Sequence, residues 1–107
     1  MDMFLSKTER VAIIRVCLDI AGADHDVCRR EANILNEISN EIGFTDRDFE
    51  ALEYIDFDKA LDIISNLSER EKGFVRWAIM NIVEADGNAT RNEMHLARLA
   101  GIFGDLD

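Results

Sequence analysis

The chain has no proline and only six glycines among its 107 residues. Proline ends or kinks a helix, and glycine weakens one, so long helices meet few obstacles in this sequence. Residues that favour helices, such as alanine, leucine, glutamate and arginine, recur throughout, whereas runs of β-branched residues are short. These features predict an all-α protein.

Cysteine is scarce, and long apolar runs are absent. Cys17 and Cys28 form neither a disulfide framework nor a CxxC zinc motif. No segment reaches the ~20 apolar residues that a membrane-spanning helix needs, and Arg15 interrupts the apolar run near the start that could otherwise suggest a signal sequence. We therefore expect a cytoplasmic protein without a membrane span, folded as one domain over residues 1–107.

Basic residues are outnumbered, with 12 Lys and Arg against 22 Asp and Glu, which gives a net charge of −10. An acidic surface repels phosphate groups, which argues against nucleic-acid binding and against attachment to anionic membranes. It attracts cations or a basic protein partner. A simpler interpretation is that the dispersed charges only keep the protein soluble. The sequence indicates no particular oligomeric state.

Helix start and stop signals divide the chain into about six helices. Capping boxes, in which a Ser or Thr and an acid three residues later bond each other's backbone amides, are predicted at Ser6, Ser68 and Thr90. Gly43 is a typical residue to end a helix. The predicted helices cover 7–23, 28–42, a short stretch after Thr45, 57–66, 69–85 and a last segment that stops near 104.

Apolar side chains at steps of three and four predict the buried face of each helix. In the first helix these are Ile13, Cys17 and Ile20, and in the fifth they are Val75, Ile79 and Ile82. In the third helix we expect Phe49 to face inward and to pack on Phe44 as a hydrophobic staple. Trp77 lies beside the buried face of the fifth helix, where it is expected to be half buried.

One pattern occurs twice. The first acidic segment (Ala23–Glu31) and the second acidic segment (Ala85–Glu93) both run Ala-Asp, six further residues, then Glu, and both separate two predicted helices. The first and second helices thus correspond to the last two. This internal repeat predicts a compact bundle of about six helices with approximate two-fold symmetry.

The acids of both segments continue the apolar faces of their helices. Asp24 follows Ile20, and Asp86 follows Ile82, each by four residues, while Glu31 and Glu93 begin the buried faces of the helices that follow. A carboxylate that faces the interior needs a partner, or its pKa rises and it becomes protonated. Backbone amides at the helix starts, a nearby arginine (Arg29, Arg30 or Arg91) and a metal ion are the three possibilities.

The metal hypothesis depends on the whole set of oxygen ligands. Carboxylate and amide oxygens suit Ca²⁺ or Mg²⁺ better than Zn²⁺. The spacing differs from that of an EF-hand loop, in which glycine takes the sixth position and glutamate the twelfth. If the two segments meet, the candidate ligands are Asp24, Asp26, Glu31, Asp86, Asn88 and Glu93.

These segments resemble those of the TerB-like domains associated with tellurite resistance. Such domains are all-helical and contain two Ala-Asp-Gly corners, each followed by Glu at this distance. Ala85-Asp86-Gly87 matches the pattern, whereas His25 stands where the family often has glycine. The resemblance implies a stress-response role, and it implicates Asp24, Glu31, Asp86 and Glu93 in cation binding, with Asp26 and Asn88 as accessory residues. It implies no catalytic reaction and no organic cofactor.

Three functional hypotheses follow. The leading one is a non-enzymatic helical module with a paired acidic site that binds a divalent cation. The alternative is a metal-independent interaction domain that binds a basic partner through its acidic face. A carboxylate-metal hydrolase is disfavoured, because no nucleophile and no histidine cluster accompanies the acids. The sequence therefore predicts no catalytic residues.

Overall fold

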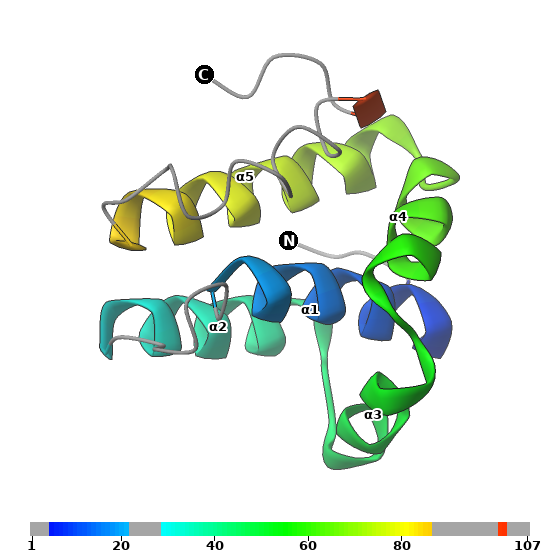
Figure 1. Cartoon of the computed structure of the whole chain (residues 1–107), viewed down its shortest axis with the longest axis horizontal. Helices are drawn as coiled ribbons and strands as arrows, with labels where there is room; N and C mark the ends of the chain where they lie inside the picture. The colour runs from blue at the N-terminus through cyan, green and yellow to red at the C-terminus, as the bar shows by residue number, and fades with distance from the viewer. Residues whose placement is uncertain (1–4, 22–28, 87–100, 103–107) are drawn as a thin grey trace.

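Helix α1 (Lys7–Ala21) lies at the centre of the fold, and the other elements pack around it (Figure 1). The computed structural model of the chain describes residues 5–21, 29–86 and 101–102, and it describes the backbone alone for 29–31 and 85–86. The further elements are α2 (Arg29–Ile42), α3 (Asp46–Glu50), the 3-10 turn η1 (Ala51–Tyr54), α4 (Phe57–Ser65) and α5 (Glu69–Asp86). These ranges contain no strand, so the all-α prediction is confirmed.

Helix α1 is buried on almost every side. The sequence predicted one buried stripe, yet Val11, Ala12 and Ile14 are buried as well. The reason is that α1 contacts α4, α5, α2 and the α3–η1 corner, which together surround it. A helix in this position needs apolar residues all round rather than on one face. Its buried residues are Val11, Ala12, Ile13, Ile14, Val16, Cys17, Ile20 and Ala21.

Helices α4 and α5 complete the core. α4 packs on α1, and α5 packs on both α1 and α2. The predicted inward residues of α5 are buried, which confirms its helical phase: Val75, Ile79 and Ile82. Leu61 and Ile64 of α4 are buried as well, and so is Leu67, which follows α4. The Cα radius of gyration is 12.6 Å, which matches the ~13 Å of a compact chain of this length. Gly101 and Ile102 are also helical, and Ile102 packs against the core.

Side-chain caps set the helix starts where the sequence predicted them. At Ser6 the box closes through bonds of 2.7 and 3.2 Å with Glu9, and at Ser68 through bonds of 3.0 and 3.2 Å with Glu71. Each hydroxyl accepts a bond from the acid's backbone amide, and each carboxylate accepts one from the serine amide. These bonds satisfy donors that a helix start leaves open. The third predicted box, at Thr90, lies outside the described residues.

The predicted inward orientation of Phe49 in the third helix was wrong. Phe49 is 65% exposed and Tyr54 is 76% exposed, whereas Leu52 and Ile55 are buried. Helix α3 ends after Glu50, and the tighter 3-10 turn that follows carries Leu52 toward the core. Within α3 the buried position belongs to Asp48, because this side chain pairs with an arginine of α1.

The six-helix symmetric arrangement stays a prediction. The described helices reproduce the first five predicted ones, with boundaries that differ by two residues or fewer where both ends are described. Most of the last predicted helix lies outside the described ranges, as does the turn that precedes it. Of the four helices that form the predicted repeat, the structure therefore describes the first, the second and the fifth along the chain.

Gly43 ends α2 with a left-handed backbone, at a φ of 74°. The amide of Phe44 donates to the carbonyl of Ser39 over 2.9 Å, which is the bond of a Schellman cap. This geometry turns the chain sharply toward α3. The predicted role of Gly43 is therefore confirmed.

Substituting alanine for Gly43 should lower the free energy of unfolding by about 1 kcal/mol, because an L side chain is strained at positive φ. An added Cβ meets no atom within 4 Å there, so the cost is a backbone cost. Gly73 in the middle of α5 is the matched control, since its surroundings are equally open. Gly73→Ala should raise stability by about 0.5–1 kcal/mol. Urea unfolding of both variants measures this, and equal signs would contradict the assignment.

Candidate functional site

Three helix ends face the same side of the molecule. In Figure 1 α1 and α5 run in the same direction and α2 runs the opposite way, so the last turns of α1 and α5 lie toward the end where α2 begins. α1 contacts α2 and α5, and α2 contacts α5. The first acidic segment connects α1 to α2, and the second begins at the end of α5. The fold therefore brings the described borders of both segments to one end.

Two of the six candidate ligands belong to described helices, and both occupy positions in phase with the core. Asp86 is the last residue of α5, one turn after buried Ile82. Glu31 is the third residue of α2, two turns before buried Ile38. Such spacings put each acid's position on the same helix face as the buried residue. Asp24, Asp26, Asn88 and Glu93 lie outside the described residues.

The described side chains contain no group of three or more His, Cys, Asp or Glu arranged to hold a metal ion. None of the six candidate ligands belongs to that set of side chains, so the paired acidic site stays a prediction. The described helices also include none that is both long and apolar enough to cross a membrane.

A partly buried ion pair that the sequence did not predict joins α1 to α3. Asp48 is 1% exposed, and both of its carboxylate oxygens accept bonds from Arg10, at 2.9 Å from Nε and 3.2 Å from Nη2. Thr45 completes the capping box, since its amide donates to Asp48 over 3.0 Å. Arg10 also donates to the carbonyl of Leu5. Local sequence indicates the Thr45 cap, but no local signal indicates that the partner is Arg10.

This pairing shifts the pKa values of both groups. The hydrogen bonds from Arg10 hold the pKa of Asp48 below its ordinary value, against the opposing effect of burial. The same contact raises the pKa of Arg10. Both groups therefore stay charged near neutral pH, and the pair functions as a structural tie between the start of α1 and the α3 corner.

Cys17 is a free, fully buried thiol in the middle of α1. Removal from water raises its pKa to about 12, because the thiolate is poorly stabilised by apolar neighbours. A thiol of this kind is a core residue rather than a nucleophile. The interpretation of Cys17 as a small apolar residue is consistent with this burial.

The helices and their common core define an all-α protein. A comparison with known families identifies the family to which it belongs. Residues 1–54 match the model of the tellurite resistance protein TerB. The match takes in half of the chain, so the protein belongs to the TerB family. It spans α1 to η1 and includes Asp24, Asp26 and Glu31, whereas the second acidic segment lies beyond it. No curated protein and no solved structure matches the chain.

Replacing Asp48 with asparagine should lower the free energy of unfolding at pH 7 by about 2 kcal/mol, because Arg10 loses its buried anion. A lowered folded-state pKa means that the contribution of Asp48 is fully present above its unfolded pKa of about 3.9. It is lost as the pH falls through the folded-state value. The difference between the two proteins, measured by urea unfolding, should therefore shrink below about pH 4. Asp46→Asn on the exposed side of α3 is the control, and an equal loss there would contradict the role of the pair.

The thiol of Cys17 should resist modification in the folded protein. A Cys28→Ser variant leaves Cys17 as the single thiol, and Ellman's reagent then reports on it alone. We expect labelling to be limited by opening of the core, and to become fast only in denaturant. Raising the pH from 7 to 9 should change the native labelling rate little, because opening of the core, and not ionisation of the thiol, then limits the rate. Rapid labelling without denaturant would contradict the burial.

Proposed function

We propose that the protein is a non-enzymatic cytoplasmic module of the TerB family whose two acidic segments together bind a divalent cation, Ca²⁺ or Mg²⁺. The observation that carries the proposal is the shared direction of α1 and α5, with α2 beginning at the end where they finish. This arrangement supports a meeting of the two segments at one end of the bundle. The family's association with tellurite resistance supports a role in stress response.

The proposed ligands are hard oxygen donors. Asp24, Asp26 and Glu31 come from the first segment, and Asp86, Asn88 and Glu93 come from the second. Ca²⁺ takes six to eight such oxygens, whereas Mg²⁺ takes fewer protein ligands and keeps bound water. A cation here neutralises acids that would otherwise repel one another, so it links the end of α1 to the end of α5.

Added cation should stabilise the fold, and this is the main test of the proposal. If the dissociation constant is one hundredth of the free Ca²⁺ or Mg²⁺ concentration, the gain in free energy of unfolding is about 2.7 kcal/mol. The measurement is the melting temperature in millimolar Ca²⁺ or Mg²⁺ against the same protein in chelator. An unchanged melting temperature in both ions would remove the proposal.

The Asp24→Asn/Asp86→Asn double variant separates the possible roles of these acids. If they hold a cation, the cation-dependent shift disappears. If they only cap helices, stability changes little, since asparagine also caps. If they are crowded without a metal, the variant is more stable because repulsion is relieved. The Glu50→Gln/Glu53→Gln variant removes the same charge from an exposed corner of the fold and should keep the full shift.

A second candidate function is a metal-independent interaction domain that binds a basic partner. The observation in its favour is a cluster of exposed acids beside an exposed aromatic ring, Glu37 and Glu41 on α2 with Trp77 on α5. These groups lie on the side wall between α2 and α5. Such a surface suits a cationic side chain, which pairs with carboxylates and stacks on indole.

A further inference from the structure

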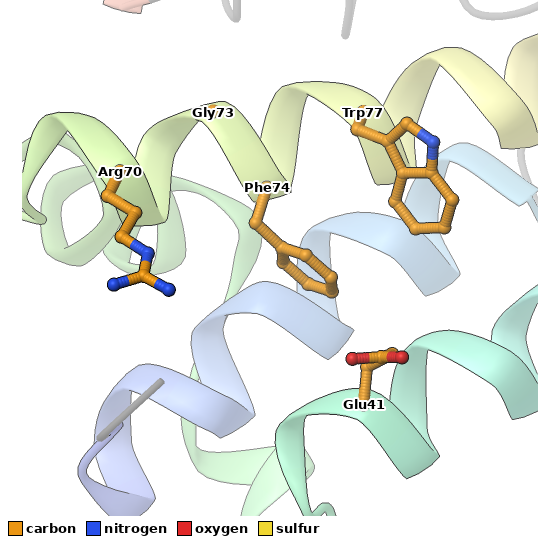
Figure 2. A pocket seen from close by; sticks show the side chains of 5 residues that line it. All are labelled: Glu41, Arg70, Gly73, Phe74 and Trp77. Carbon is orange, nitrogen blue, oxygen red and sulfur yellow. The ribbon is translucent and has the colours of Figure 1, made fainter. Parts of the chain in front are cut away.

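A groove runs between α2 and α5. Figure 2 shows its first part, a pocket of about 490 Å³. A second pocket of about 450 Å³ shares Glu41 and Trp77 with the first and adds Glu37 and Asn40. The shared residues make the two pockets neighbouring parts of one groove. Its described lining in the first pocket is Glu41, Arg70, Gly73, Phe74 and Trp77.

The α5 wall of the groove is aromatic and firmly held. Phe74 is 5% exposed and packs in the core, and its ring centroid lies 5.7 Å from that of Trp77 at a tilt of 36°. Trp77 keeps 48% of its surface exposed. An indole ring held on one side and open on the other is the kind of residue that dominates binding energy at protein interfaces.

Gly73 opens the middle of this wall. It lies in the interior of α5, where glycine weakens a helix relative to alanine. An added Cβ would meet nothing within 4 Å, so packing inside the protein does not require glycine there. The missing side chain leaves room at this point of the pocket lining, between Arg70 and Trp77 along α5. This room admits a side chain or a helix from outside.

The charges along the groove are separated. Glu37 and Glu41, one helical turn apart on α2, are exposed, and Figure 2 shows the carboxylate of Glu41 directed toward the space beside Phe74 and Trp77. Arg70 lies at the other end of the first pocket. The acids and the indole lie together, so a cation placed there gains both ion pairing and a cation–π contact.

We propose that this groove binds a helical segment of a basic protein partner, with a lysine or arginine between Trp77 and Glu37/Glu41 and an apolar side chain over Phe74 and Gly73. The proposal depends on the second candidate function and not on the cation site. It assigns the partner's contact to the side wall between α2 and α5. A helix laid in a groove presents its anchors at steps of three and four, and Arg70, Gly73, Phe74 and Trp77 line the pocket along one face of α5, where such anchors can meet them.

The test uses the fluorescence of Trp77, the single tryptophan of the chain. The probe is an acetylated and amidated amphipathic peptide of about 14 lysine and leucine residues, with leucines at helical spacing. We expect a saturable change in Trp77 emission with this peptide, and none with the peptide in which glutamate replaces lysine. No change with the lysine peptide would overturn the proposal.

Two double variants with the same change in net charge locate the contact. Glu37→Lys/Glu41→Lys should weaken binding of the fluorescently labelled peptide by about tenfold, because the groove acids become repulsive. Glu50→Lys/Glu53→Lys, on the α3–η1 corner, should change it by less than about threefold. Equal weakening in both variants would mean a general charge effect and would reject the groove.

Gly73→Leu tests the room in the groove separately from charge. It should raise the melting temperature by about 4 °C through better helix propensity, and still weaken peptide binding at least tenfold by filling the space. Unchanged binding in this variant would reject the groove. Two findings on the protein alone would also reject it. Poor quenching of Trp77 by the neutral quencher acrylamide would mean that the groove is filled by this chain, and a Trp77 emission that shifts with protein concentration would mean that it is filled by a second copy.

The two proposals fail in different ways. Peptide binding should persist in chelator, and the Glu37→Lys/Glu41→Lys variant should show the same cation-dependent melting shift as the original protein. A protein that binds the peptide but shows no cation effect removes the cation site alone. A cation effect without peptide binding removes the groove alone.

Discussion

The burial of α1 on nearly every side is the constraint on which the rest of the fold depends. A central helix of 15 residues with eight buried apolar ones cannot be covered by one neighbour, so α2, α4, α5 and the α3–η1 corner must all pack against it. Each neighbour then needs only a narrower apolar face. The arrangement of the described helices follows from this, because each described element from α2 to α5 contacts α1.

Packing alone does not fix where α1 begins relative to its neighbours, and polar groups supply that register. The Arg10–Asp48 pair ties the first turn of α1 to the cap of α3, and the carboxylate that caps α3 is the same one that accepts the two guanidinium bonds. A buried carboxylate without such a partner costs several kcal/mol, so alternative registers of α3 against α1 are penalised. The Asp48 side chain thus combines a local role, the cap of α3, with a long-range one, the ion pair with Arg10 of α1.

Local signals predicted local structure well, and long-range partners were out of their reach. Ser6 and Ser68 cap helices as their spacing predicted, since a cap and its target are neighbours in sequence. Thr45 and Asp56 cap α3 and α4 in the same local way. The prediction for Phe49 was wrong because the orientation of α3 depends on the contact between Asp48 and Arg10, two residues far apart in the chain. For the same reason the acidic segments were found by their repeat, whereas the groove at Trp77 was not. A groove needs two helices placed side by side. The sequence predicted only that Trp77 on α5 is half buried, and it did not indicate that α2 lies opposite.

The repeat and the groove bear differently on function because they occupy different parts of the α2–α5 contact. Asp86 and Glu31 belong to the helix ends, where the chain leaves α5 and enters α2. Glu37, Glu41 and Trp77 lie further along the same two helices, on their flank. A cation that joins the helix ends also constrains the α2–α5 spacing, and this spacing sets the width of the groove. If both proposals hold, the peptide binds without the cation, but a cation at the helix ends changes the peptide's affinity, and each ligand should then alter the affinity of the other by the same factor.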